Sequence, residues 1–166
     1  MYLKRNSTKK KLLPLIQAVV ILAIVVGGIW LWSFVRVYFS YSSYTKEHVL
    51  IKSSVLVGYI ADTEAERTKG LSGKKYLPLN TAMLFKFDKP DTHGIWMKDM
   101  FFPIDIIWLD KNNEIVNLIS NAEPSSYPHV FYPPEKALYV LEVRSGLIKD
   151  KGLKLGDEIL LEKNNS

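Results

Sequence analysis

Cysteine is absent from this chain of 166 residues. Without thiols the protein can hold no disulfide framework, no zinc–thiolate site and no cysteine nucleophile, so several classes of enzyme are excluded. The absence says little about cellular compartment, because a chain without thiols is compatible with either side of a membrane. The length suits one folded domain with a real hydrophobic core.

Acidic residues are absent from the first 46 positions, which carry seven lysines and arginines. The rest of the chain has 15 basic and 17 acidic residues, a net charge of −2. The formal charge of +5 for the whole chain therefore comes from its N-terminal segment. Because a mildly acidic domain lacks the attraction to phosphates that drives nucleic-acid binding, we expect no nucleic-acid partner.

Charge is also absent from Leu12 to Val35. At ~1.5 Å per residue this stretch forms ~36 Å of helix, enough to cross a hydrocarbon core of ~30 Å. It predicts a transmembrane helix at residues 12–35, with the lipid bilayer as partner. A cleaved signal peptide would have a shorter apolar region, and a buried core helix is rarely apolar on every face.

The basic cluster of Lys4, Arg5 and Lys9 to Lys11 lies only on the near side of this stretch, which predicts a cytoplasmic basic tail at residues 1–11. The protein is then a single-pass cell-membrane protein with its N-terminus in the cytoplasm. We expect a stalk at residues 36–47 and an extracytoplasmic β domain at residues 48–162.

Short apolar runs separated by turn residues make up the predicted domain, a pattern that favours strands. We expect a mainly β fold, a compact antiparallel sandwich or small barrel with one or two short helices. Asp62 or Thr63 can cap a short helix that Gly70 or Gly73 ends. The segment Asn121 to Lys136 has four prolines and three aromatic residues, and predicts a long ordered loop.

Several motifs of catalysis and cofactor binding are missing. The three histidines show no ligand spacing, and the sequence has neither a serine nucleophile elbow nor a glycine loop that cradles phosphate. We therefore expect no metal and no cofactor.

Three blocks occur in a distinctive order and spacing: "ADTEAERTKGL", "AMLFKFDKPDTHGIWMKDMFFPIDIIWLDKNNEIV" and "LYVLEVRSGLIKDKGLKLGDEI". Together they resemble the uncharacterised bacterial and archaeal family called domain of unknown function 192, over residues 55–161. Trp96 to Lys98, followed by Pro103 to Asp105, is the most specific part. The resemblance implies a mainly β fold, often with an N-terminal signal or anchor, and no established activity.

The chain departs from the family pattern at three places. Ser72 to Lys74 stands where the family usually has a methionine and an aromatic residue. Ala82 stands where the family has glycine, and Asp99-Met100 stands where it has Asn-Thr. The resemblance therefore implies no ligand contacts for these positions.

Asp105 lies between Ile104 and Ile106, inside a run that reads as a buried strand. An ionised carboxylate without partners is costly in an apolar core. One hypothesis is structural: the oxygens of Asp105 accept backbone N–H bonds from a neighbouring loop, or pair with Arg67 or Lys98.

The other hypothesis is functional, and it gathers Asp105, Arg67, Asp62 and Trp96 around one pocket with His93 near the rim. Arg67 would bind a carboxylate or phosphate through two hydrogen bonds, and Asp105 would act as a general base.

Glu142 also interrupts an apolar strand and is a candidate second acid, as two carboxylates flanking a sugar would suggest glycoside chemistry. Trp108 is simplest to explain as core. Tyr127 and Tyr132 lie on the proline-rich loop, where their rings could stack on a glycan or peptide, or fold down as a lid over the sheet.

Two functions follow from these observations. The first is an envelope-associated binding or structural module with a glycan, peptide or protein ligand. The alternative is a hydrolase or carbohydrate-active enzyme that uses Asp105 with Arg67. The candidate catalytic residues are Asp105, Arg67 and Glu142, and the candidate ligand-binding residues are Asp62, Arg67, His93, Trp96, Lys98, Asp105, Tyr127 and Tyr132.

Overall fold

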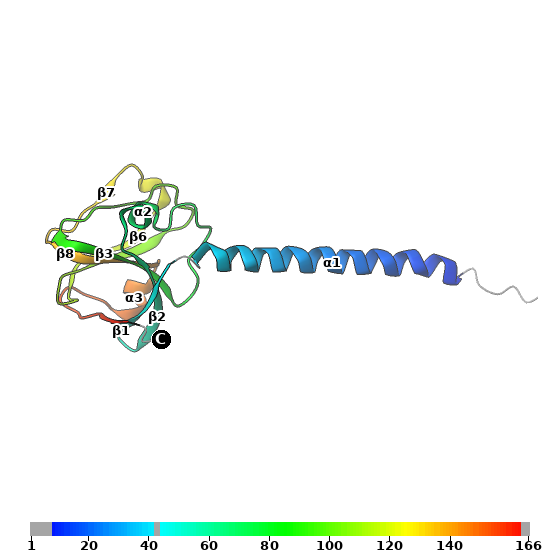
Figure 1. The fold of residues 1–166 in the computed structure, drawn as a ribbon, viewed down its shortest axis with the longest axis horizontal. Coiled ribbons are helices and arrows are strands. Elements are labelled where there is room, and N and C mark those ends of the chain that lie inside the picture. The colour runs from blue at the N-terminus through cyan, green and yellow to red at the C-terminus, as the bar shows by residue number, and fades with distance from the viewer. Residues whose placement is uncertain (1–7, 42–43, 164–166) are drawn as a thin grey trace, which may run out of the picture. The chain divides into compact units, whose positions relative to one another are not determined.

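The computed structural model describes residues 8–41 and 44–163, with side chains described at residues 17–32, 41 and 44–163. The chain divides into two units, Met1–Ser43 and Tyr44–Ser166 (Figure 1). Residues 1–7 of the predicted basic tail and residues 42–43 of the predicted stalk lie outside the described residues.

The first unit contains one helix, α1 (Thr8–Tyr41), which includes the whole of the predicted span. In the described part of the chain, no helix combines the length and the apolar character that crossing a membrane requires.

The second unit is mainly β, as expected. A seven-stranded sheet has the order β6-β5-β8-β3-β2-β1-β9, and a second sheet pairs β4 with β7. The strands are β1 (Lys46–Ile51), β2 (Ser54–Ala61), β3 (Thr81–Asp91), β4 (Ile95–Trp96), β5 (Ile104–Leu109), β6 (Ile115–Ala122), β7 (Val130–Phe131), β8 (Ala137–Arg144) and β9 (Leu160–Lys163), and the helices are α2 (Glu64–Lys69), the 3-10 turn η1 (Pro124–Ser126) and α3 (Leu147–Lys151).

The large sheet is mixed, so the expectation of a purely antiparallel fold is wrong. Strands β2 and β3 run parallel, and Val57 to Ala61 pair in register with Thr81 to Phe85. The other paired strands that the structure describes are antiparallel. The physical reason is the connection: two parallel strands need a crossover, and here α2 and the segment after it supply one.

The two ends of the strand order come back together. Glu114 and Glu158 form a single antiparallel bridge, and Ile115 N–H donates to the carbonyl of Asp157 at 2.9 Å. These residues precede β6 and β9, the first and last strands of the order. The sheet therefore curls back on itself at this point.

Register determines which side chains share a face of the sheet. In antiparallel pairs, residues directly opposite each other point the same way. Glu142 pairs with Met83 on one side and Ile106 on the other, whereas Val143 pairs with Asp105. Because successive residues of a strand alternate, Glu142 and Asp105 point to opposite faces.

The face of Asp105 carries the larger apolar core, which includes Leu147 and Ile148 of α3. The opposite face is covered by α2, and Figure 1 shows α2 and α3 on opposite sides of β3 and β8. The members of the core cluster are Val49, Ile51, Leu56, Ile60, Ala82, Leu84, Ile107, Leu109, Ile115, Leu141, Val143, Leu147, Ile148, Leu153 and Ile159.

Helix α2 is the short helix expected from the sequence. Its N-cap is Thr63, whose hydroxyl accepts from Glu66 N–H at 3.2 Å, while Glu66 Oε2 accepts from Thr63 N–H at 3.2 Å. Gly70 ends the helix at φ 42°, where a side chain would be strained. This reciprocal capping fixes a helix of only six residues, which carries Arg67 and Lys69.

Candidate functional site

The β domain contains a pocket of about 190 Å³ on the face opposite Asp105. It lies between α2 with the turn that follows it, strands β3 and β8, and the short strand β4. The lining residues are Arg67, Thr68, Lys69, Gly70, Leu71, Ser72, Phe85, Phe87, Gly94, Ile95, Trp96, Met100 and Glu142.

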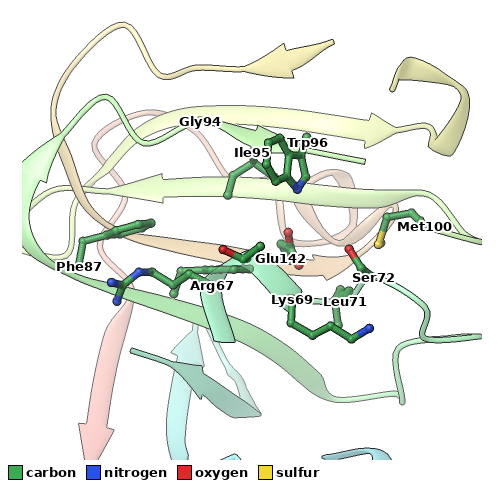
Figure 2. Close-up of a pocket in the computed structure, with 13 residues that line it drawn as sticks. Arg67, Lys69, Leu71, Ser72, Phe87, Gly94, Ile95, Trp96, Met100 and Glu142 are labelled. Carbon is green, nitrogen blue, oxygen red and sulfur yellow. The ribbon is translucent and has the colours of Figure 1, made fainter. Parts of the chain in front are cut away.

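Glu142 lies at the centre of this pocket (Figure 2). Its neighbours in the sheet, Met83 and Ile106, are fully buried, and Glu142 itself is only 4% exposed. Within the described part of the chain, its Oε2 atom has no hydrogen-bond partner. Burial raises the pKa of Glu142 to about 8, because desolvation penalises the charged form. At neutral pH the group is therefore a carboxylic acid, which can donate one hydrogen bond and accept others.

Arg67 is held at the edge of the pocket by backbone groups. Its Nη1 donates to the carbonyl of Lys86 at 2.8 Å and also to the carbonyl of Asp62. The guanidinium carbon lies 5.2 Å from the centre of the Phe87 ring, a cation–π arrangement. These contacts fix the guanidinium in place.

Lys69 is the second cation of the lining. Among residues 44–163, neither Arg67 nor Lys69 forms an ion pair with a carboxylate. Glu142 is also the only acid among the lining residues. The pocket therefore carries net positive charge while Glu142 is protonated.

Aromatic and apolar side chains form the rest of the walls. Phe85 and Phe87 project from β3, and Figure 2 shows Arg67 and Phe87 on one side of Glu142, Lys69 and Met100 on the other, and Trp96 across from them. Trp96 is 44% exposed, so much of its ring is open to solvent. A few polar groups within a largely apolar wall are typical of small-molecule sites.

Asp105 does not line this pocket, which corrects the hypothesis that it works beside Arg67. It is fully buried, its Oδ1 accepts from Asn121 N–H at 2.8 Å, and its Oδ2 accepts from Ile148 N–H at 2.8 Å. Asp105 accepts backbone N–H bonds, as the structural hypothesis expected, but the donors belong to β6 and α3 and not to a loop, and neither Arg67 nor Lys98 is its partner. The reason is the register, which points Asp105 to the face away from α2.

Three other predicted residues lie beside the pocket without lining it. The His93 ring stacks on Phe87 with centroids 3.4 Å apart and an interplanar angle of 6°. Asp62 contributes its carbonyl to Arg67, and Lys98 contributes its carbonyl to the Ser72 hydroxyl at 2.7 Å. The side chains of Asp62 and Lys98 are exposed.

The two tyrosines of the proline-rich loop differ in their distance from the pocket lining. Tyr132 lies against Gly94, where an added Cβ would be 2.5 Å from its ring Cε1, and yet it is 60% exposed. Tyr127 is exposed and is not part of the lining. Trp108 is core as expected, being fully buried with Nε1 donating to the carbonyl of His93 at 2.8 Å. Of the loop tyrosines, Tyr132 thus adjoins the pocket.

The sequence singled out three of the lining residues: Arg67, Trp96 and Glu142. It missed the contributions of Lys69, Ser72, Phe85, Phe87 and Met100. One signal was present, since Phe85 and Phe87 alternate along β3 and so share the face of Glu142. In the described part of the chain, no group of three or more histidine, aspartate and glutamate side chains is arranged to hold a metal ion.

Residues 49–161 match the model of a protein family described as "Uncharacterized ACR", domain of unknown function 192. The chain belongs to this family. The match begins six residues before the region that the sequence blocks indicated and ends at the same residue, so it includes the second half of β1 as well as the pocket residues. No protein with a curated description matches the chain.

Two solved structures are similar to this member of the domain of unknown function 192 family. One, from Sinorhizobium meliloti, is described as a candidate transcription regulator; it has 29% sequence identity and a TM-score of 0.67, with 72% of this chain and 95% of that chain covered. The other is a protein of unknown function from Novosphingobium aromaticivorans; it has 29% identity and a TM-score of 0.64, with 70% of this chain and 84% of that chain covered.

Proposed function

We propose that the β domain is a ligand-binding module whose site is the pocket around Glu142, and that α1 tethers this module to the outer side of a cell membrane. The observation that carries the proposal is the buried carboxyl group of Glu142, which has an oxygen without a partner in the described part of the chain.

Such a group is destabilising unless something else uses it. A buried donor or acceptor left unsatisfied costs about 1–3 kcal/mol. The neighbouring positions on the same face, Met83 and Ile106, are apolar and fully buried, so an apolar residue would suit position 142 better for packing alone. A ligand that hydrogen-bonds to Glu142 would remove this penalty.

The size of the pocket limits the ligand. Sites for drug-sized molecules usually span ~300–1,000 Å³, and this pocket of about 190 Å³ is smaller. It suits one sugar ring, one amino acid or the end of a longer glycan or peptide, which are components of a cell envelope.

A hydrolase is the second candidate. In this enzyme Glu142, and not Asp105, would be the catalytic carboxyl group beside Arg67. A carboxylic acid with a pKa raised to about 8 is suited to general-acid catalysis. Glycoside hydrolysis usually requires two carboxylates, however, and Glu142 is the only one among the lining residues. Binding without turnover is therefore the proposal we favour.

The membrane tether is supported by the first unit of the chain. Leu12 to Val35 carries no charge, and the helix α1 runs through all of it. The basic cluster of residues 4–11 lies before this stretch, which supports a cytoplasmic N-terminus by the positive-inside rule. Within residues 17–32 of α1, where side chains are described, the large exposed apolar side chains are Val19, Val20, Ile21, Leu22, Ile24, Val25, Val26, Ile29, Trp30, Leu31 and Trp32.

Two fractionation measurements test the tether. We expect the full-length protein to stay with membranes after alkaline carbonate washing, and its C-terminal domain to be digested by protease added outside intact cells. Release of the intact chain by carbonate, or protection of the domain in intact cells, would contradict the tether and its orientation.

A thermal-shift screen tests the binding site. The full chain in detergent would be screened against sugars, sugar acids, amino acids and short peptides, in parallel with Glu142→Met. We expect at least one compound to raise the melting temperature of the wild type and not that of the variant. Asp150→Asn, which changes an exposed carboxylate outside the pocket, should respond as the wild type does. A screen in which every compound acts alike on wild type and Glu142→Met would refute the proposed site.

A further inference from the structure

We infer that the pocket binds a small hydroxylated anion, a sugar ring that bears a carboxylate or a phosphate group, with the anionic group at Arg67 and a hydroxyl of the ring at Glu142. This inference rests on the proposed function and names the class of ligand.

The first argument is charge. The charged residues that line the pocket with Glu142 are Arg67 and Lys69 of α2. Tyr44, ahead of β1, is coupled electrostatically to Glu142, and Lys74 Nζ lies 5.6 Å from the centre of its ring. Burial first, and then the negative charges of Glu66 and Glu142, raise the pKa of Tyr44, so this phenol is neutral at physiological pH. Strands β3 and β4 add only Phe85, Phe87, Ile95 and Trp96 to the lining. Among the lining residues, a protonated Glu142 is therefore accompanied by two cations and no anion.

The second argument is the geometry of Arg67. Both of its hydrogen bonds to backbone carbonyls use Nη1, and within the described residues its Nε and Nη2 make none. The stacking on Phe87 holds the plane of the guanidinium. A fixed fork with free N–H groups is the arrangement that binds carboxylate and phosphate oxygens, often through two parallel bonds.

The third argument concerns the uncharged part of the ligand. Glu142 supplies a buried donor and acceptor, which pairs with hydroxyl groups that can themselves both donate and accept. The half-exposed ring of Trp96 offers a flat apolar surface on the far side of the pocket from Glu142 (Figure 2). A sugar ring has hydroxyls at its edge and C–H groups on its faces, and it matches both surfaces at this volume.

An ammonium ligand is the opposing possibility, because it would pair with an ionised Glu142 against aromatic walls. The two types of ligand predict opposite responses to pH. An anion binds best while Glu142 is protonated and weakens as pH rises through about 8, whereas a cation binds more tightly over the same range. The positive charge of Arg67 and Lys69 favours the anion.

The experiment compares four probes with one ring: glucose, glucosamine, glucuronate and glucose 6-phosphate. Titration calorimetry of the full chain in detergent at pH 6.5 gives the dissociation constants. We expect glucuronate or glucose 6-phosphate to bind at least about tenfold more tightly than glucose and glucosamine, as one charge-assisted hydrogen bond provides. The two anions distinguish a carboxylate source from a phosphate source.

Three variants assign the contacts. Arg67→Gln removes the guanidinium that would bind the anionic group and should weaken binding of the preferred anion at least about tenfold, with Lys75→Gln as the control from an exposed lysine outside the lining. Lys69→Gln removes a positive charge on the other side of Glu142 and should weaken binding less. Wild-type binding should weaken at least tenfold between pH 6.5 and 9, and Glu142→Gln, which cannot ionise, should lose this pH dependence.

Failure of this inference is distinguishable from failure of the proposed site. Equal or tighter binding of glucose or glucosamine overturns the anionic class and keeps the pocket as a binding site. Binding of none of the four probes overturns the sugar-acid class, and the broader screen with Glu142→Met then decides the site by itself. Anion binding that Lys75→Gln weakens as much as Arg67→Gln overturns the assignment to this pocket.

Discussion

Two buried carboxylates on neighbouring strands of this protein have opposite surroundings. Asp105 of β5 faces the apolar core beneath α3, and each of its oxygens accepts a backbone N–H at 2.8 Å. Glu142 of β8 faces α2, and its Oε2 has no partner in the described part of the chain. Asp105 pairs with Val143, the residue that follows Glu142, so the two acidic side chains point to opposite faces of the sheet.

The comparison shows that burial alone does not identify a functional acid. Asp105 is the more deeply buried of the two, yet its bonds join the end of β6 and the start of α3 to β5. Glu142 lines a cavity, and its Oε2 bonds to no other segment within the described part of the chain. The hydrogen bonds that a buried acid lacks are thus more informative than its depth.

The largest expected effect is a pH dependence of stability that belongs to Glu142 alone. The ordinary pKa of a glutamate is 4.5, and in the folded protein that of Glu142 is about 8. Between these values the folded state holds a proton that the unfolded state has lost. The free energy of unfolding should therefore fall by about 1.4 kcal/mol per pH unit as pH rises from 4.5, and level off above 8.

Urea unfolding at a series of pH values, for wild type and Glu142→Gln, measures this slope as a difference. The variant has no titrating group at position 142, and the lowered pKa values of Glu66 and Asp157 affect both proteins equally. A difference in unfolding free energy that stays constant from pH 5 to pH 9 would show that Glu142 is not protonated in the fold.

Asp105→Asn should produce the next largest effect, a loss of about 3 kcal/mol in the free energy of unfolding. The side-chain amide has only one oxygen, so its NH₂ group would face the N–H of Asn121 or Ile148. Urea denaturation at pH 7 measures the loss. If Asp105 is purely structural, the folded fraction should bind the pocket ligand with unchanged affinity, and weaker binding would restore a functional role to this residue.

Glu142→Met should have the opposite sign and raise the free energy of unfolding by about 2 kcal/mol at pH 7, because it removes an unsatisfied polar group from between Met83 and Ile106. The same variant should lose ligand binding, a trade of function for stability. The measurement is urea denaturation alongside Asp105→Asn. A destabilised Glu142→Met protein would mean that the carboxyl group has a partner that stabilises the fold.

The smallest effect is expected at Asp150, an exposed acid two residues beyond Ile148 in α3. Its Oδ2 lies 2.6 Å from Nη2 of Arg144, but these side chains are 53% and 41% exposed. Exposed pairs of this kind contribute about 0.2–1 kcal/mol. Asp150→Asn should therefore shift the urea midpoint only slightly, and an effect as large as that of Asp105→Asn would show that charge at α3, rather than the amide bonds, stabilises this region.

Local patterns explain the parts of the fold that the sequence predicted. Thr63 and Glu66 have the spacing of a capping box, and α2 begins where they predict. Glu142 and Asp105 both stand out because each interrupts an apolar strand. Which of them faces the pocket depends on pairing between β5 and β8, and residues 105 and 143 are too far apart in the chain for local patterns to show it.

The partners of Asp105 were equally hidden from the sequence. The amide of Ile148 is 43 positions away and that of Asn121 is 16 away, and any residue type except proline could supply such a donor. Likewise, nothing local distinguishes a parallel from an antiparallel neighbour for β2. The pocket depends on the pairing of β5 with β8 and on the parallel pairing of β2 with β3. Neither pairing can be read from local patterns, which is why the sequence analysis put Asp105 in the pocket.

The parallel pairing of β2 with β3 has a consequence for how this architecture can diversify. A crossover between two parallel strands of one sheet is almost always right-handed. The segment that connects β2 to β3 therefore lies on one fixed side of the sheet whatever its sequence. Arg67 and Lys69 both belong to that segment, while the main apolar cluster lies behind the strands. A relative could therefore exchange residues 62–80 and acquire a new specificity without repacking its interior.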